Sequence, residues 1–434
     1  MEESFDQAAP EVGEEEARKV KALIRWILQY APAKRPSARE ILADPWFCEI
    51  DVESGSPNAI IMSQINVGIV GYGNSAKVYN LPYLLPHPEF QVYAFLQRSA
   101  APSDLASAKP GSHCTVDFPQ AKHYRTSDEF FADEEIELVI VCTQFDTHAE
   151  FAGKALNANK HVVVEKPFTT SSEEADRLIA LAKTKNKVLT VYQNRRWDGD
   201  FLTLQHILDK GVLGTVTEAE IHYDFENPPW LSYMTAKGYT PGDGNMFGLG
   251  SHTIDQALVL FGRPKSVIGI MTVLRGIESE TEDSFTLILQ YDGQLLVTVK
   301  TTIVTPMVSQ PKYLIRGTKG SYMKFGTDVQ EEQILSGIQS TSAEFGIGDP
   351  NDDGILTTYD EFDGRYQTYN SKAKKYSGKY PTLPGRNRGY YESVADVLRG
   401  RAELNVQPEQ SRDGVRLMEL ARESYLTGRT VLWS

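Results

Sequence analysis

The chain has 434 residues, of which 41% are hydrophobic and 24% charged, and its formal net charge at pH 7 is −14. This length allows two or three domains, and the acidic balance argues against nucleic acid or an anionic membrane as a partner of the whole surface. The three cysteines are too far apart for a disulfide framework or a CxxC metal site. No apolar run reaches membrane-spanning length, and no secretory signal is evident. We therefore expect a cytoplasmic protein.

The first 61 residues differ from the rest of the chain. Residues 20–47 resemble the end of a protein kinase C-lobe, with the pattern PxxRPSAxExLxxPWF, and Ser37 and Glu40 form a capping box that predicts a short helix. The Gly-rich loop, His-Arg-Asp loop and Asp-Phe-Gly of a kinase are absent, which excludes kinase activity. We therefore interpret residues 1–61 as an acidic extension ending in a linker, left by a fusion or a misjoined gene model. Met62 is the expected natural start.

From Met62 to Gln193 strands and helices alternate, which is typical of a doubly wound parallel sheet of the Rossmann type. The predicted strands are Ile65–Val70, Phe90–Gln97, Leu138–Cys142, His161–Val164 and Val188–Tyr192. The predicted helices are Asn74–Leu85, a short one from Thr126, Thr147–Asn157, and one capped by Ser171 or Ser172 that runs to Lys185.

In residues 194–434 the regular alternation of strands and helices ends, and most of the predicted elements are strands. The predicted strands are Val216–Phe225, Ser266–Leu274, Ser284–Tyr291, Gln294–Val304 and Lys312–Arg316, and the predicted helices are Phe201–Lys210, Thr253–Phe261, Gly389–Arg399 and Gln410–Thr427. Residues 336–385 are polar and glycine-rich and are predicted to be irregular. We expect an α+β domain with a mostly antiparallel open sheet, whose uncovered face is buried in a homodimer or homotetramer.

The turn after the first strand has the form GxGxxA, which suits a dinucleotide pyrophosphate. Gly71 permits the tight turn, Gly73 allows close approach of the phosphates, and Ala76 allows the helix to pack near the strand. Two further segments also follow strands, Thr143–His148 and Glu165–Pro167, and the carboxyl ends of parallel strands form one crevice. The residues predicted to bind the cofactor here are Gly71, Tyr72, Gly73, Asn74, Ser75, Ala76, Thr143, His148, Glu165 and Lys166.

The end of the second strand bears on cofactor choice. An acidic residue there would bind the ribose of NAD, whereas an arginine accommodates the 2′-phosphate of NADP. The strand ends in Arg98 and Ser99 without an acid, which favours NADP over NAD.

The chain resembles the Gfo/Idh/MocA oxidoreductases over nearly all of residues 62–434. The resemblance rests on the glycine turn, on Glu165-Lys166-Pro167 and on the glycine-rich segment Gly242–Asp255. Within the family, the stretches Gln193–Phe201, Leu249–Gln256 and Lys324–Glu331 look like the NADP-dependent scyllo-inositol dehydrogenase branch. The resemblance implies hydride transfer between NADP and a hydroxyl or keto carbon of a polyol, cyclitol or sugar.

The resemblance also assigns roles to single residues. Lys166 donates a hydrogen bond to the substrate oxygen and His252 is the general acid or base, so both are catalytic and substrate-binding candidates. Asp255 either binds substrate or caps a helix. Many members carry an aspartate four residues before the histidine, where this chain has Gly248. This departure leaves open a non-catalytic dinucleotide sensor of the galactose-repressor-like type.

The resemblance places Arg195 and Trp197 on the nicotinamide or substrate, and an Arg–Asp network with Asp198 and Asp200 is the alternative. His222 could line a sugar pocket, or could face the core. The acidic segment Asp349–Asp360 resembles an EF-hand loop but lacks the helix before it and the final glutamate, so no metal site is expected.

Overall fold

The structure is a computed structural model that describes residues 63–433, and these residues form one unit beginning at Gln64. The interpretations of residues 1–61, including the capping box at Ser37 and Glu40, lie outside the described residues. The resemblance to a kinase C-lobe is therefore untested by the structure.

Sheet A is a six-stranded parallel sheet in the order β3-β2-β1-β4-β5-β6, as predicted for the Rossmann domain. Its strands are β1 (Ile65–Val70), β2 (Phe90–Leu96), β3 (Lys122–Tyr124), β4 (Leu138–Val141), β5 (His161–Val164) and β6 (Leu189–Val191). All four residues of β4 are buried. Such a strand is covered on both faces, because successive side chains point to opposite sides of the sheet.

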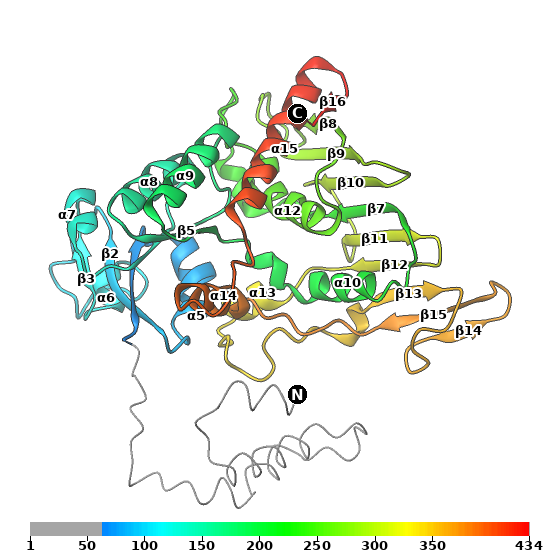
Figure 1. The fold of residues 1–434 in the computed structure, drawn as a ribbon, viewed down its shortest axis with the longest axis horizontal. Coiled ribbons are helices and arrows are strands. Elements are labelled where there is room, and N and C mark those ends of the chain that lie inside the picture. Colours follow the sequence, from blue (N-terminus) through cyan, green and yellow to red (C-terminus); the bar gives the residue numbers. More distant parts are fainter. Residues whose placement is uncertain (1–62, 434) are drawn as a thin grey trace, which may run out of the picture. The chain divides into compact units, whose positions relative to one another are not determined.

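Helices from different parts of the chain cover the two faces of sheet A (Figure 1). The sheet's helices are η2 (Ser75–Asn80, a π-helix), α5 (Leu81–Leu84), α6 (Cys114–Asp117), α7 (Ser127–Ala132), α8 (His148–Asn157) and α9 (Ser172–Lys185). Val139 belongs to the same core cluster as Ala152 of α8, whereas Ile140 belongs to a second cluster that includes Tyr391 of α14 (Arg388–Leu398). The C-terminal part of the chain therefore completes the core of the Rossmann domain.

Sheet B has ten strands in the order β14-β15-β13-β12-β11-β7-β10-β9-β8-β16. They are β7 (Val216–His222), β8 (Ser266–Thr272), β9 (Ser284–Gln290), β10 (Leu296–Thr301), β11 (Pro311–Gly317), β12 (Gly320–Phe325), β13 (Gly354–Thr358), β14 (Thr368–Asn370), β15 (Lys375–Tyr380) and β16 (Val431–Leu432). Only the β7–β10 pair is parallel among these described strands, so the sheet is mostly antiparallel as predicted.

The prediction that residues 336–385 are irregular is wrong. Strands β13, β14 and β15 lie in this region and extend the sheet beyond β12. All three residues of β14 are exposed, and β15 buries only its last residue, Tyr380. Strands β14 and β15 therefore carry little alternation of apolar and polar residues. Strand β13 does bury one face, but Leu356 is the only large apolar residue on it, so its alternation is also faint in the sequence.

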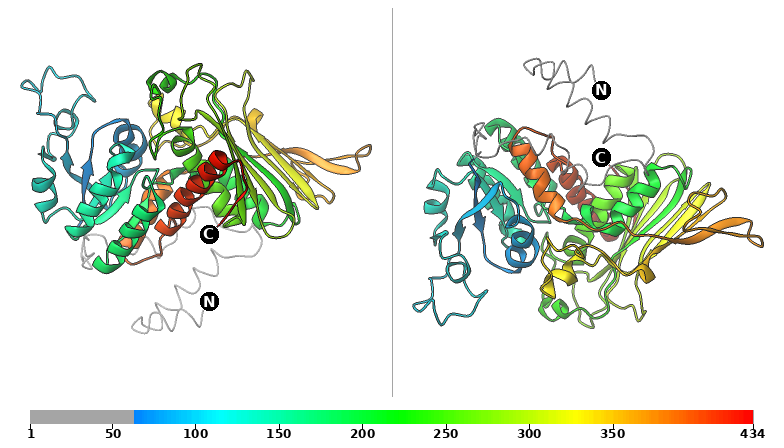
Figure 2. Two further views of the ribbon diagram at one scale, coloured as in Figure 1. Left: turned by 90° about the horizontal axis from the view of Figure 1, so that it is seen from above. Right: turned by 90° about the horizontal axis from the view of Figure 1, so that it is seen from below.

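Helices cover only one face of sheet B, and they lie on the side that faces sheet A (Figure 2). They are α10 (Gly199–Asp209), α11 (Asn245–Gly248), α12 (Gly250–Phe261) and α15 (Pro408–Thr427), and α13 (Gln330–Leu335) lies beside η2. In β8, Gly269 faces α15 so closely that a Cβ there would meet the carbonyl oxygen of Ala421 at 2.1 Å. Its neighbour Ile270 points the other way and is 48% exposed.

No helix within residues 63–433 has the length and apolar character needed to cross a membrane.

Candidate active site

The glycine turn has the geometry that a dinucleotide needs. Gly71 has φ +93°, and a Cβ on it would lie 2.8 Å from the carbonyl oxygen of Cys142. A Cβ on Gly73 would meet no atom within 4 Å, so this side of the turn is open. Ala76 is fully buried against the strand. The turn is thus closed toward the sheet and open where phosphates would approach, and the residues present fit a bound dinucleotide.

Glu165 connects this turn to the end of β5. Its Oε1 accepts hydrogen bonds from Ser75 Oγ and Asn80 Nδ2, both at 2.8 Å, and its Oε2 accepts from the backbone N–H of Lys166 at 3.0 Å. The carboxylate is buried. The predicted cofactor-binding residue Glu165 therefore acts through its neighbours, by fixing the helix η2 against the lysine segment.

Lys166 reaches from β5 across to the second domain. Its Nζ donates a hydrogen bond of 2.8 Å to the carbonyl oxygen of Gly248, at the end of α11. Burial lowers the pKa of Lys166, and the cationic Arg195 lowers it further, while Glu165 opposes the shift. A lysine with a lowered pKa transfers a proton more readily near neutral pH.

His252 lies in the first turn of α12 and lines the same pocket as Lys166. Burial lowers the pKa of His252 well below its usual range, and the positive charges of Lys166 and Arg195 add to this effect. The imidazole is therefore neutral at pH 7 and able to accept a proton. Its Nδ1 is buried and has no hydrogen-bond partner within the described residues. Buried polar atoms are nearly always paired, so this nitrogen is available to a ligand.

The pocket between the two domains has a volume of about 210 Å³. It combines the two predicted catalytic groups with aromatic and charged walls, which suits a small polar molecule. Its lining residues are Tyr79, Glu165, Lys166, Tyr192, Asn194, Arg195, Tyr223, Phe225, Trp230, Leu249, His252 and Glu331.

Glu331, a carboxylate to which the sequence analysis gave no role of its own, forms part of one wall of this pocket. Arg195 Nη2 donates a hydrogen bond of 2.5 Å to Glu331 Oε2, and Tyr79 Oη donates one of 2.8 Å to Oε1 of the same carboxylate. Burial raises the pKa of Glu331, but Arg195 and the Tyr79 hydroxyl together lower it by more, so the carboxylate is ionised. Glu331 is the last residue of Lys324–Glu331, a stretch that resembles the family. That resemblance was the one sequence signal that pointed to Glu331.

Other predicted cofactor residues lie around the turn. Tyr72 Oη donates to Asp117 at 2.7 Å, and Asn74, Arg98 and Ser99 are exposed. The Thr143 hydroxyl accepts from Thr147 at 2.8 Å.

His148 is buried, and its ring nitrogens contact main-chain carbonyls, Nδ1 that of Pro167 at 2.7 Å and Nε2 that of Thr143 at 3.2 Å. The ring therefore holds the two strand ends in place.

Three residues predicted to contact the substrate or the nicotinamide, Trp197, His222 and Asp255, do not line the pocket. Asp255 is held in a two-bond ion pair by Arg196, at 2.6 and 2.7 Å, and is 3% exposed. Trp197 packs its ring edge-on against Tyr390, 5.7 Å between centroids.

The ring of His222 lies 3.1 Å from a carboxylate oxygen of Glu220 and 3.1 Å from one of Asp224. It does not line the pocket, because successive side chains along a strand point to opposite faces and its neighbour Tyr223 lies there instead. The predicted Arg–Asp network exists in part, because Arg195 also pairs with Asp198 at 3.3 Å.

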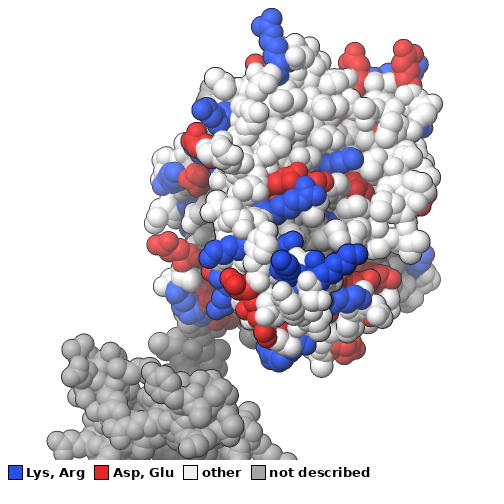
Figure 3. Space-filling view, turned by 90° about the vertical axis from the view of Figure 1, so that its right-hand side faces the viewer, with Lys and Arg blue, Asp and Glu red and all other residues white. Residues whose placement is uncertain are grey.

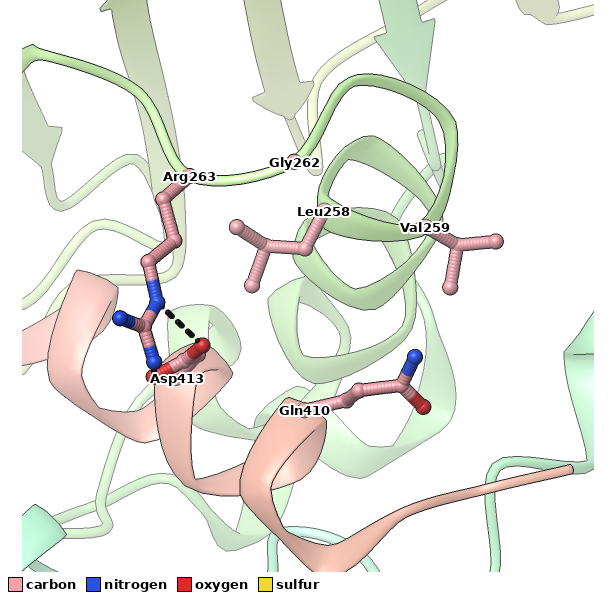
Figure 4. A pocket seen from close by; sticks show the side chains of 6 residues that line it. All are labelled: Leu258, Val259, Gly262, Arg263, Gln410 and Asp413. Carbon is pink, nitrogen blue, oxygen red and sulfur yellow. Dashed lines mark hydrogen bonds and ion pairs between the residues drawn. The ribbon is translucent and has the colours of Figure 1, made fainter. Parts of the chain in front are cut away.

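A second, smaller hollow of about 70 Å³ lies between α12 and α15 (Figure 4). It is lined mainly by Leu258, Val259 and Gln410, and the Arg263–Asp413 ion pair of 2.6 Å closes one side. Both charges are neutralised by each other, and none of the predicted site residues lies here. The chemistry therefore belongs to the pocket at Lys166.

Comparisons with known proteins agree with this geometry. Residues 65–193 match the family model described as "Oxidoreductase family, NAD-binding Rossmann fold", and residues 201–323 match the model of the GFO/IDH/MocA C-terminal domain. The chain belongs to the Gfo/Idh/MocA oxidoreductase family. The family resemblance and the fold class expected from the sequence are thereby confirmed, whereas the resemblance of residues 20–47 to a kinase C-lobe is untested.

Individual relatives cover most of the chain. An uncharacterized oxidoreductase of Schizosaccharomyces pombe, C115.03, is 38% identical over 377 residues, covering 84% of this chain and 98% of the relative. The scyllo-inositol 2-dehydrogenase (NADP(+)) IolW of Bacillus subtilis is 34% identical over 368 residues, covering 85% and 96%. The solved structure of the putative oxidoreductase yvaA from B. subtilis superposes with a TM-score of 0.75 at 32% identity, covering 86% and 99%.

Proposed function

We propose that this family member is an NADP-dependent dehydrogenase or reductase that interconverts a hydroxyl and a keto carbon of a polyol, cyclitol or sugar. The observation that carries the proposal is that Lys166 and His252 line one pocket, and that Glu165 of the same pocket accepts a hydrogen bond from Ser75 of the glycine turn. The similarity to IolW supports the substrate class, since that relative is a scyllo-inositol dehydrogenase using NADP.

The residues of the pocket divide the chemistry between them. The glycine turn Gly71–Ala76 would hold NADP, and the bound cofactor would supply the hydride chemistry of the reaction in either direction. Lys166 donates a hydrogen bond from Nζ to the substrate oxygen and stabilises the negative charge that develops there. The neutral imidazole of His252 takes the hydroxyl proton in oxidation.

Arg195 and Glu331 orient the substrate. Arg195 also stacks over the ring of Tyr223, with 5.0 Å between its guanidinium carbon and the ring centroid, so both are held rigidly. The ionised Glu331 is an acceptor for further hydroxyl groups of a polyol. This wall favours substrates with several hydroxyl groups over simple alcohols.

The preference for NADP follows from Arg98 and Ser99 at the end of β2. Both side chains are exposed and carry no acid beside them, so they are free to meet a 2′-phosphate.

The test is a spectrophotometric screen of NADP reduction over inositols, aldoses and polyols. We expect activity with at least one cyclitol or sugar, and a loss of about 10²-fold or more in kcat for both Lys166→Ala and His252→Ala. Lys154→Ala, a surface lysine paired with Glu150 on α8, is the matched control and should keep full activity. No turnover of any substrate by folded, NADP-binding protein would refute the proposal.

That outcome would favour the second candidate, a dinucleotide-binding sensor. Gly248 is the observation behind it, because the acidic residue that many family members carry there is missing. The sensor would bind NADP as tightly as the enzyme and would be unaffected in that binding by His252→Ala.

We further propose that the protein is a cytoplasmic homodimer or homotetramer joined through the open face of sheet B. Ile270 and Ile355 are 48% and 39% exposed on the open sheet, and Figure 3 shows neutral surface over much of that side of the molecule. Ile270→Glu should lower the mass measured by light scattering. Leu85→Glu, which changes an equally exposed leucine of the Rossmann domain, should not.

A further inference from the structure

Two histidines and a cysteine gather outside the pocket, below the end of β2. His113 precedes α6, Cys114 begins it, and His123 lies in β3. One ligand atom from each of the three residues lies within 4.8 Å of the others. In a tetrahedral zinc site, bonds of about 2.0–2.3 Å place nitrogen and sulfur ligands about 3.3–3.8 Å apart. Each side chain therefore has to move by only about 1 Å to share one ion.

Main-chain carbonyls already orient both imidazole rings. Nε2 of His123 lies 2.9 Å from the carbonyl oxygen of Gln97, and Nε2 of His113 lies 3.3 Å from that of Ser99. A carbonyl oxygen can only accept, so in both rings Nε2 carries the proton and Nδ1 carries the lone pair. Metal-bound histidines are oriented in this way, with the second nitrogen donating to a carbonyl or carboxylate.

The remaining contacts of the His113 ring come mainly from Thr115. Nδ1 of His113 lies 2.9 Å from the Thr115 hydroxyl oxygen, accepts from the backbone N–H of Thr115 at 3.3 Å, and lies 3.9 Å from Cys114 Sγ. The histidine rings meet edge to face, with 4.8 Å between centroids. A metal bound at Nδ1 of His113 would replace the contacts of that nitrogen with Thr115, and the half-buried Thr115 hydroxyl can rotate away to make room.

We propose that His113, Cys114 and His123 bind a Zn²⁺ ion, with water as the fourth ligand. Two imidazoles and a thiolate suit zinc and exclude Mg²⁺ and Ca²⁺, which require oxygen ligands. On binding, the Sγ–H bond of Cys114 breaks, a Zn–S bond forms and the proton leaves to solvent. The site is separate from the Lys166 pocket, and no step of the proposed reaction uses it.

The location gives this ion a structural task. It would tie α6 to the edge strand β3, and through the two carbonyls it would fix the segment Gln97–Ser99. The backbone N–H of Cys114 also donates to Gln97 Oε1 at 3.0 Å, so three contacts join the cluster to that segment.

Co²⁺ is the probe that tests the site, because its absorption reports both coordination and sulfur. The full chain, reduced and freed of metal, is titrated with Co²⁺ and then with Zn²⁺. We expect about one equivalent to bind, a thiolate-to-cobalt charge-transfer band to appear, and Zn²⁺ to displace the cobalt and raise the melting temperature. His123→Ala, a change at a half-buried edge position, should abolish the band and weaken binding at least about tenfold.

Two controls keep the test specific. Cys142→Ala removes the other described cysteine and His87→Ala removes a half-buried histidine elsewhere, and both should keep the band. Cys114→Ser should lose it, with unchanged far-UV dichroism showing that the variant is folded. The proposal fails if the intact chain binds no cobalt at stoichiometric concentration, or if the band survives in Cys114→Ser.

Discussion

Replacing Gly248 by aspartate tests how the environment of Lys166 sets its pKa. Gly248 has room for the change, since a Cβ there would meet only Asn245 Oδ1, at 3.9 Å. The new carboxylate would stand where many family members carry one. Because it adds a negative charge beside an amine whose pKa burial has lowered, we expect the pKa of Lys166 to rise.

The size of the rise follows from the distances. Lys166 Nζ lies 2.8 Å from the carbonyl oxygen of residue 248. The carboxylate of an aspartate at this position lies about 5 Å from Nζ, given standard bond lengths. At an effective dielectric constant of about 20 the attraction is about 3 kcal/mol, or about 2 pKa units. Exposure of the pocket to solvent reduces this, so we expect a rise of about 1–2 units.

The assay is competitive labelling of Lys166 by an amine-reactive reagent across pH, read by mass spectrometry. It needs no knowledge of the substrate. Gly248→Asn is the matched control, since it adds the same shape without the charge and should leave the labelling curve within about 0.3 units of the wild type. Equal shifts in both variants, or no shift with aspartate, would refute the electrostatic account of Lys166.

Three further predictions concern the cofactor site and the ion pair beside it. Arg98→Asp should move the preference toward NADH by about tenfold or more, measured by fluorescence titration of both cofactors, and unchanged discrimination would count against the role of Arg98. Gly71→Ala should lower the free energy of unfolding in urea by about 1–3 kcal/mol and weaken NADP binding. The reason is that φ +93° strains any other residue and that the new Cβ would meet the carbonyl oxygen of Cys142. A variant of normal stability would contradict this turn geometry. Asp255→Asn should destabilise the fold by about 3 kcal/mol by leaving the Arg196 charge unpaired, and a large rise in KM without loss of stability would instead restore Asp255 as a substrate ligand.

The sequence predicts the Rossmann domain well because its signals are local. Buried strands such as Leu138–Val141 are short apolar runs, and Ser171 caps α9 by accepting from the N–H of Glu174 as expected. Strands β14 and β15 escape prediction because they form an edge of sheet B with few buried side chains, and the inner strand β13 escapes it because Leu356 is the only large apolar residue on its buried face. The packing of α14 on sheet A also has no local signal, because Ile140 and Tyr391 come into one hydrophobic cluster only through the topology of the whole chain.

The site follows the same division. Lys166, Arg195 and His252 were predicted from their motifs and do line one pocket. Their partners could not be predicted, because Glu331 meets Arg195 across 136 residues and Gly248 meets Lys166 across 82. Asp255 was predicted from its place in the helical turn of His252, and His222 from its place on the first strand of the second sheet. The structure shows both in ion pairs that no local pattern encodes.

The anchor of Lys166 has a consequence for how the protein tolerates mutation. A side-chain partner can be lost through a single base change, but the group that accepts from Nζ is the peptide carbonyl of residue 248, which every amino acid possesses. Mutations at codon 248 can therefore alter the charge and polarity around the amine of Lys166 while the hydrogen bond from Nζ to the backbone carbonyl is kept. The chemistry at this position is therefore open to evolutionary tuning, and a laboratory library at codon 248 would vary the proton affinity of the amine without first destroying its placement.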